Sequence, residues 1–173
     1  MCSLQSTLRA TTTFVLPSSR LSVCSTVDYP NSNRNTGHDW IGRNTGGGAV
    51  QVWVHHFKAF EYLPSVQIAQ YEGQAARVGV ALEQWEVYSY MAKNNITLLA
   101  PGSPTVGAYG GFMQGGGFSY ITSKYGLMAD QVLALEVVTA DGHFVHADPD
   151  TNADLFWAIR GGGPSESCLT SGS

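Results

Sequence analysis

GSPTVGAYGGFMQGGG, residues 102–117, places seven glycines in sixteen positions of an otherwise ordinary sequence. A glycine loses more backbone freedom on ordering than any other residue, at a cost of roughly 0.5–1 kcal/mol relative to alanine. The residues between the glycines include Val106, Tyr109, Phe112 and Met113, whereas a flexible linker carries mainly small polar or charged side chains. We therefore predict that this run is ordered and that its main chain contacts a ligand or another segment.

The overall composition is that of a folded domain that is not adapted to nucleic acid. The chain has 173 residues, of which 43% are hydrophobic and 13% are charged, with a formal net charge of -4. It has no cluster of Lys or Arg, so the long-range attraction to nucleic acid or to an anionic membrane is missing. It also has no apolar stretch of about 18 residues, the length that spans a bilayer. We expect no nucleic-acid or membrane partner, and we expect local dipoles to hold any bound phosphate.

The amino-terminal residues and the cysteines carry little information. Residues 1–34 are rich in Ser, Thr and Asn and show no helical or strand periodicity, so we expect an irregular or disordered segment. They contain no clear export signal, which leaves the cellular location open. Cys2, Cys24 and Cys168 are widely spaced and form no CxxC pair, so we expect no metal site.

Three stretches read as strands before and within the glycine-rich region. Residues 49–57, AVQVWVHHF, alternate three valines with larger or polar side chains, which predicts a half-buried strand. The adjacent His55 and His56 would point to opposite faces of that strand and cannot share a metal ion. Residues 76–82 predict a second strand, and residues 96–102 predict a short buried strand that leads into the glycine run.

Two segments have helical patterns. Residues 83–95, EQWEVYSYMAKNN, predict a helix with Trp85, Tyr88, Met91 and Ala92 on one face. Residues 148–163, DPDTNADLFWAIRGGG, begin with polar residues, continue as an amphipathic helix and reach a glycine stop at Gly161.

The clearest structural signal is a hairpin over residues 131–148, QVLALEVVTADGHFVHAD. Two alternating runs meet at Asp141-Gly142, a dipeptide that favours a tight turn. His143 and His146 follow this turn at odd spacing, and we interpret them as solvated. Because strands outnumber helices and come as hairpins, we predict an α+β fold with a mainly antiparallel sheet flanked by helices.

A second loop with possible chemistry covers residues 33–48, NRNTGHDWIGRNTGGG. Its turn-forming residues around Gly37, His38 and Gly42 can bring backbone N–H groups together as an anion-binding nest. The alternative is a simple turn in which Asp39 bonds to its own backbone. Neither glycine-rich segment matches the GxGxxG dinucleotide fingerprint or the phosphate-binding GxxxxGK[ST] motif, so a bound nucleotide would be held in another way.

Four motifs together resemble one protein family. These motifs are RNTGHDWIG (34–42), GSPTVGAYGGFMQGGG (102–117), SKYGLMADQVLALEVVTADG (123–142) and NADLFWAIRGGG (152–163). They occur in the order found in the FAD-linked oxidases of the vanillyl-alcohol oxidase type, which include the berberine-bridge-enzyme-like group. The resemblance implies a partial PCMH-type FAD-binding domain over residues 35–164, between the amino-terminal segment 1–34 and an irregular tail, 165–173.

The cofactor that the resemblance implies is FAD. The loop over residues 34–42 would wrap the pyrophosphate, and His38 would be the residue that the family commonly bonds to a methyl group of the flavin ring. A neutral imidazole suits this role, and Asp39 or a backbone carbonyl could fix its tautomer. Bicovalent members place a cysteine before the PTVG motif, where this chain has Ser103, so we predict at most one covalent link.

The resemblance also implies a set of cofactor contacts drawn from both loops and from the SKYGLMAD segment. The set comprises Asn35, Thr36, Gly37, His38, Asp39, Gly42, Ser103, Pro104, Thr105, Val106, Gly107, Gly110, Gly111, Gly115, Gly116, Gly117, Tyr125, Gly126 and Asp130. No catalytic base is identified. Tyr109, Tyr120 and Tyr125 lie in or beside the glycine run, and we interpret them as packing residues.

The implied activity is oxidation of a small molecule. In the family, hydride passes from an alcohol, a sugar or an aromatic metabolite to FAD, and then to O2. The chain departs from the family pattern where VDYPNSN precedes the first motif and PSESCLTSGS follows the last, so we expect an incomplete enzyme that is inactive alone and binds FAD weakly or not at all. The alternative is a non-catalytic, β-rich interaction module that has lost the cofactor.

Overall fold

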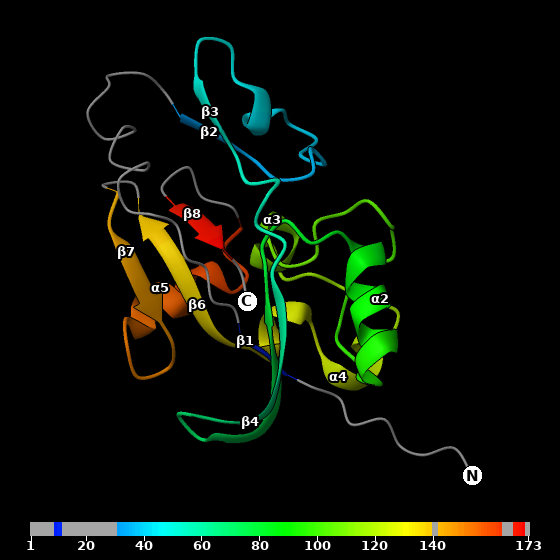
Figure 1. Cartoon of the computed structure of the whole chain (residues 1–173). Helices are drawn as coiled ribbons and strands as arrows, with labels where there is room; N and C mark the ends of the chain where they lie inside the picture. The colour runs from blue at the N-terminus through cyan, green and yellow to red at the C-terminus, as the bar shows by residue number, and fades with distance from the viewer. Residues whose placement is uncertain (1–8, 12–30, 140–141, 164–167, 172–173) are drawn as a thin grey trace.

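The computed structural model describes residues 9–11, 31–139, 142–163 and 168–171, and its strands form two sheets (Figure 1). The larger sheet contains β1 (Arg9–Thr11), β4 (Phe60–Ile68), β5 (Tyr71–Val78), β6 (Val132–Thr139), β7 (Phe144–Ala147) and β8 (Cys168–Ser171). The smaller sheet contains β2 (Asn31–Arg34) and β3 (Val50–Trp53), and lies at the top of Figure 1. The helical segments are η1 (Arg43–Thr45), α2 (Gln84–Asn94), α3 (Gly111–Gln114), α4 (Thr122–Tyr125), η2 (Met128–Gln131) and α5 (Ala153–Ile159). The predicted α+β class is confirmed.

The larger sheet has the strand order β4-β5-β1-β6-β7, with β8 paired to β6. The β4–β5, β6–β7 and β6–β8 pairs are antiparallel, whereas β1 is parallel to both β5 and β6. Two antiparallel units are therefore joined through one short parallel strand. The mainly antiparallel character was predicted, but the parallel junction was not.

The irregular segments expected at the two ends of the chain contain strands. Residues 1–34 include β1 and β2, and the tail 165–173 includes β8, so the expectation was wrong for these three elements. Each is only three or four residues long, which is too short for the period-two pattern to register. Each owes its strand conformation to a partner that is distant in sequence.

The predicted strand over residues 49–57 is shorter and more exposed than expected. β3 ends at Trp53 and pairs in parallel with β2, and Val50 and Trp53 keep 42% and 53% of their surface exposed. A sheet of two described strands offers little cover for its faces, so burial increases only toward the end of the valine alternation, where Val52 is half-buried and Val54 is 7% exposed. Because His55 lies beyond the end of the strand, the face argument for the histidine pair does not apply.

β4 was missed, and β5 begins earlier than the predicted strand over residues 76–82. β4 contains Pro64, which lacks an N–H donor for the ladder, and the β4–β5 register shifts between Leu63 and Val66. A bulge at such a position accommodates the proline. β5 stops at Val78, and Gly79 follows in a turn whose N–H donates to the Ala59 carbonyl at 2.8 Å.

The helix over residues 83–95 is confirmed as α2, but the face that carries Trp85 and Tyr88 is not its buried face. Gln84 and Val87 are buried, while Trp85 is 53% exposed and Tyr88 36% exposed. The aromatic residues suggested a core face, whereas the smaller Val87 packs into the core cluster. The helix start is stabilised because the Glu83 N–H donates to Glu86 Oε2 at 2.9 Å.

β6 is the centre of the core. Leu135 and Val137 are fully buried, and the strand is buried on both faces because other elements cover it on each side. Tyr109, Met113 and Met128 belong to the same cluster, so the glycine run contributes directly to the core. The segment after α2, residues 96–102, is buried as predicted but is not one of the described strands.

The hairpin over residues 131–148 is confirmed as β6–β7. Thr139 donates its N–H to the His143 carbonyl at 2.9 Å, and Gly142 adopts a φ of +83°. Asp141, the other predicted turn residue, lies outside the described residues. The predicted final helix is confirmed as α5, and Gly161 follows it with a φ of +119°.

The described residues contain no helix with the length and apolar character that a bilayer span requires. Within the same ranges, no three His, Cys, Asp or Glu side chains gather as they would around a metal ion.

Candidate functional site

The two loops that the sequence singled out meet in space. His38 Nε2 lies 3.0 Å from Thr105 Oγ1, although the two residues are 67 positions apart. The Gly107 N–H donates to Thr36 Oγ1 at 3.2 Å across the same junction. These two contacts place the loop after β2 against the first half of the glycine run. The two loops therefore lie side by side, and their role as a common site stays a prediction.

The Asn35 side chain, from the first loop, packs against the glycine run. Its Nδ2 donates to the Val80 carbonyl at 2.7 Å, and its Oδ1 is buried without a hydrogen-bond partner in the described part of the chain. A Cβ on Gly107 would lie 2.6 Å from Asn35 Nδ2, and one on Gly110 would meet the same atom even more closely. The packing of Asn35 therefore requires glycine at both positions. These two glycines are thus explained by the close approach of another segment, whereas the family resemblance implied contact with the cofactor.

The loop over residues 34–42 forms a turn that is held by its own glycines and by hydrogen bonds to Asp39. Gly37 and Gly42 have φ values of +93° and +74°, a region that favours glycine. Asp39 accepts the Arg43 N–H at 2.6 Å and the Arg43 guanidinium at 2.7 Å. These bonds from Arg43 hold the pKa of Asp39 below its usual value. Asp39 thus closes the turn, and the group beside the His38 imidazole is the Thr105 hydroxyl.

The junction of the two loops is open to solvent. His38, Ser103, Pro104 and Thr105 are exposed, while Val106 is half-buried. Two large apolar side chains follow His38, and Trp40 and Ile41 keep 99% and 75% of their surface exposed. Exposed apolar side chains next to polar groups are typical of a binding surface.

The second half of the glycine run has different surroundings. The Met128 N–H donates to the Gly117 carbonyl at 2.8 Å, and the Ala129 N–H donates to the Gly116 carbonyl at 2.9 Å. Gly116 and Gly117 are buried, and Gly111 begins the short helix α3. In this half only Gly115 is exposed. Gly116 and Gly117 therefore bond to η2, and among the glycines of this half only Gly110, which packs against Asn35, has a described contact with the His38 loop.

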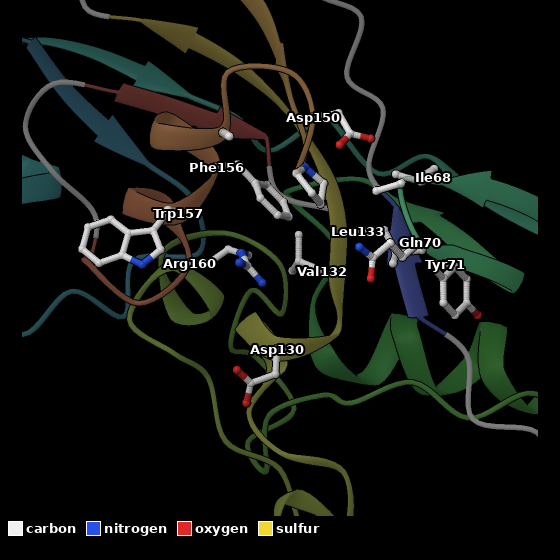
Figure 2. A pocket seen from close by; sticks show the side chains of 13 residues that line it. Ile68, Gln70, Tyr71, Asp130, Val132, Leu133, Asp150, Phe156, Trp157 and Arg160 are labelled. Carbon is white, nitrogen blue, oxygen red and sulfur yellow. The ribbon is translucent and has the colours of Figure 1, made fainter.

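The remaining predicted residues, Tyr125, Gly126 and Asp130, lie at the end of α4 and in η2, and only Asp130 borders a cavity. Asp130 Oδ2 accepts the Leu127 N–H at 2.8 Å, and Gly126 has a φ of +81°. Asp130 borders a cavity of about 960 Å³ between the β4–β5 turn, the start of β6 and α5. Figure 2 shows Asp130 on one side of this cavity, with Trp157 of α5 and Arg160, which follows α5, among the other lining residues. Tyr125 is half-buried against the core.

Sequence reasoning missed two residues beside the first loop, Arg34 at the end of β2 and Trp53 at the end of β3. The β2–β3 register places Arg34 opposite Trp53, and the Arg34 guanidinium lies 5.3 Å from the Trp53 ring centroid. Trp53 Nε1 donates to the Asn35 carbonyl at 3.0 Å, which ties the indole to the loop. Arg34 is the first residue of the RNTGHDWIG motif. Its charge was therefore a signal that could have extended the predicted set by one residue.

The tyrosines divide between packing and exposure. Tyr109 is buried and donates its hydroxyl to the Leu99 carbonyl at 2.8 Å, and burial raises its pKa. Tyr120 is 79% exposed, so the packing interpretation was wrong for this residue. Of the four other histidines, His55 stacks on Trp53 at 4.7 Å, and His146 Nε2 lies 2.9 Å from Asp148 Oδ2. His56, like His143 and His146, is exposed, as expected.

A comparison with known families identifies the class of protein to which this fold and these two loops belong. The profile of the family described as an FAD binding domain matches residues 12–148. The chain therefore belongs to this family, among the FAD-linked oxidoreductases of the vanillyl-alcohol oxidase type. The match overlaps the predicted range 35–164 but begins and ends earlier.

Individual relatives agree with this placement. The VAO-type flavoprotein oxidase VAO615 from Thermothelomyces thermophilus is 43% identical over 130 residues, which are 75% of this chain and 23% of that protein. The crystal structure of MtVAO615 from Myceliophthora thermophila C1 superposes with a TM-score of 0.83 at 37% identity, over 89% of this chain and 28% of that one.

A glucooligosaccharide oxidase from Acremonium strictum, solved in a study of its 6-S-cysteinyl, 8α-N1-histidyl FAD, has a TM-score of 0.71 at 25% identity. The superposition covers 89% of this chain and 31% of that one. The present chain thus spans less than a third of the length of each of these relatives.

Proposed function

We propose that the junction of the two loops is the FAD site of a flavin-dependent oxidoreductase. The observation that supports this most directly is the 3.0 Å contact between His38 and Thr105. It brings two of the four motifs that carry the family resemblance together at one exposed surface. FAD would supply a two-electron acceptor that takes hydride from a substrate and passes the electrons to O2.

The residues present fit the two chemical halves of FAD. The flat ring system needs apolar cover and hydrogen-bonding groups, which Trp40, His38 and Thr105 offer on one exposed face. The diphosphate needs backbone N–H groups and positive charge, and Gly37 provides a main chain with positive φ beside the Arg34 side chain. We further propose that Gly110–Gly117 and Gly126–Asp130 support this surface from behind.

We propose that His38 is the single covalent attachment residue. Its Nε2 is engaged by the Thr105 hydroxyl, which leaves Nδ1 as the nitrogen available for a bond to the cofactor. The relative studied for its histidyl FAD supports this role for a histidine. Ser103 has a hydroxyl where a thioether would need a thiol, so a second link is not expected.

The substrate class is a proposal from the family. A complete relative would oxidise an alcohol, a sugar or an aromatic metabolite, and this chain spans 23% of the length of VAO615. We propose that residues without a counterpart here supply the substrate pocket and the base. This chain alone would then bind FAD weakly and show no turnover.

The test uses the purified chain with excess FAD. After free cofactor is removed, the protein is denatured, and flavin fluorescence is measured on the polypeptide. We expect fluorescence to stay with the wild-type chain and to be lost in His38→Ala. His56→Ala is the matched control, because His56 is also an exposed histidine of the same β2–β3 region.

Three other outcomes would change the proposal. A yellow protein that releases all flavin on denaturation would contradict covalent attachment but leave the FAD site intact. Retention of flavin in His38→Ala would move the attachment to another residue. A wild-type chain that stays colourless at excess FAD would favour the interaction module without cofactor.

A further inference from the structure

The first loop contains two arginines in different electrostatic states. Arg43 is paired with Asp39 at 2.7 Å, so the two charges largely cancel. Arg34 has no carboxylate partner among the described residues, and its Nε is buried without a hydrogen-bond partner. The loop over residues 34–48 therefore presents one uncompensated guanidinium. A guanidinium without a carboxylate partner is available to pair with an anion.

Several contacts fix the Arg34 guanidinium in place. Its central carbon lies 5.3 Å from the centre of the Trp53 ring, within the range of a cation–π interaction. The indole is itself held by the bond from Trp53 Nε1 to the Asn35 carbonyl. The Val54 N–H donates to the Arg34 carbonyl at 3.0 Å, which fixes the backbone at the end of β2. The charge therefore has a defined position before any ligand binds.

The position of this charge faces the turn that carries His38. A Cβ on Gly37 would lie 3.6 Å from Arg34 Nη2, so the guanidinium is in contact range of the Gly37 backbone. Gly37 has a φ of +93° and is exposed. A guanidinium fork beside an exposed backbone of this kind is suited to bind a phosphate with two parallel bonds.

We propose that Arg34 binds the diphosphate of FAD as its charged partner. This inference rests on the proposed FAD site, because a diphosphate is the anionic group of that cofactor. It changes the expectation that local dipoles alone hold the phosphates. Trp53 is then a positioning residue that keeps the guanidinium aimed at the Gly37 turn.

The experiment compares three probes that share different parts of FAD. FAD, ADP and riboflavin are titrated into the wild-type chain and into Arg34→Gln, with affinity read by calorimetry or flavin fluorescence. Loss of charge-assisted bonds should weaken FAD and ADP about 10- to 100-fold. Riboflavin has no phosphate, so its affinity should change less than about twofold. Higher salt should reduce the difference for FAD and ADP.

Two further variants keep the result interpretable. Arg77→Gln removes the same charge from a residue that pairs with Glu61 on the larger sheet, and should leave all three affinities unchanged. Arg34→Lys keeps the charge without the fork and should give an intermediate loss for FAD and ADP. Circular dichroism and thermal unfolding of each variant confirm that it is folded.

The outcomes separate this inference from the proposed function. Binding of FAD and ADP that is unchanged in Arg34→Gln would overturn the role of Arg34 alone. An equal loss of riboflavin would also overturn it, by indicating general damage to the loop. A wild-type chain that binds ADP through Arg34 but neither flavin would overturn the FAD site while upholding the anion site. Failure of the wild-type chain to bind any of the three probes would overturn both.

Discussion

The two halves of the glycine-rich run differ in what they contact. Residues 102–107 are mostly exposed and bond to the loop after β2 through the Thr105 hydroxyl and the Gly107 N–H. Residues 110–117 are mostly buried and bond to η2 through the carbonyls of Gly116 and Gly117. One continuous low-complexity stretch therefore contains a candidate binding edge and a piece of the core.

Glycine content alone therefore does not identify a ligand-binding loop. The absence of a Cβ serves two purposes in this run. At Gly107 and Gly110 it makes room for the Asn35 side chain, and at Gly117 it allows a positive φ against Met128. Only the exposed edge around Thr105 remains available for contact with a ligand.

The largest effect on stability is expected in the buried half. Gly117→Ala places a Cβ 2.9 Å from Met128 Cβ at a φ of +65°, so both sterics and backbone conformation oppose it. We expect a loss of about 2–4 kcal/mol in the free energy of unfolding, measured by urea titration.

Gly115→Ala is the control within the same run. Gly115 is exposed, has an ordinary φ of -83°, and a Cβ there would meet no atom closer than 3.7 Å. Its unfolding free energy should stay within about 0.5 kcal/mol of the wild type. Equal losses at both positions would mean that the glycine run responds as a uniform segment, which would contradict the difference between its buried and its exposed residues.

A smaller loss is expected where the run enters the core. Tyr109→Phe removes the hydroxyl that donates to the Leu99 carbonyl and leaves that buried acceptor unpaired, at a cost of about 1–2 kcal/mol. The measurement is again urea titration near neutral pH. An unchanged midpoint would contradict a structural role for this hydroxyl.

The same residue gives a pH dependence with a defined sign. Burial raises the pKa of Tyr109 above its ordinary value of 10.0, so the folded protein keeps the phenol neutral while the unfolded chain ionises. The contribution is complete below pH 10 and is lost as the pH rises above it. Above pH 10 the wild type should therefore lose stability more steeply than Tyr109→Phe.

Local patterns account for the parts of the fold that were predicted. α2, the β6–β7 hairpin and α5 each have a period and an end signal within about 20 residues of sequence, such as Gly142 in the turn and Gly161 after the last helix. β1, β2 and β8 could not be predicted, because their strand conformation depends on partners remote in sequence. The buried face of α2 was missed because exposed aromatic residues imitate a core stripe.

The candidate site was predictable in outline but not in its internal bonds. Family motifs brought His38 and Thr105 into one hypothesis, and their contact agrees with it. The packing of Asn35 against Gly107 and Gly110 depends on contact between segments about 70 residues apart, which no local pattern encodes. The pairing of Arg43 rather than Arg34 with Asp39 likewise follows from the turn geometry.

A still smaller effect is expected at the ion pair of the first loop. Asp39→Asn removes the charge that Arg43 neutralises, and because the pair is close to solvent we expect less than about 1 kcal/mol. The pKa of Asp39 is lowered from 3.8, so its contribution is present above pH 3.8 and is lost as the pH falls through the lower folded value. Unfolding free energies at pH 7 and pH 3 should show this difference shrinking at the lower pH.

The smallest effect on stability is expected at Thr105, in the exposed half of the run. Thr105→Val removes the hydroxyl beside His38 with little change in shape, and exposed sites of this kind change the unfolding free energy by less than about 0.5 kcal/mol. If Thr105 orients the imidazole for attachment, the share of polypeptide that keeps flavin after denaturation should fall several-fold. Thr105→Ser, which retains a hydroxyl, should keep it. A stability loss as large as that of Gly117→Ala, with flavin retention unchanged, would mean that the exposed edge is structural as well.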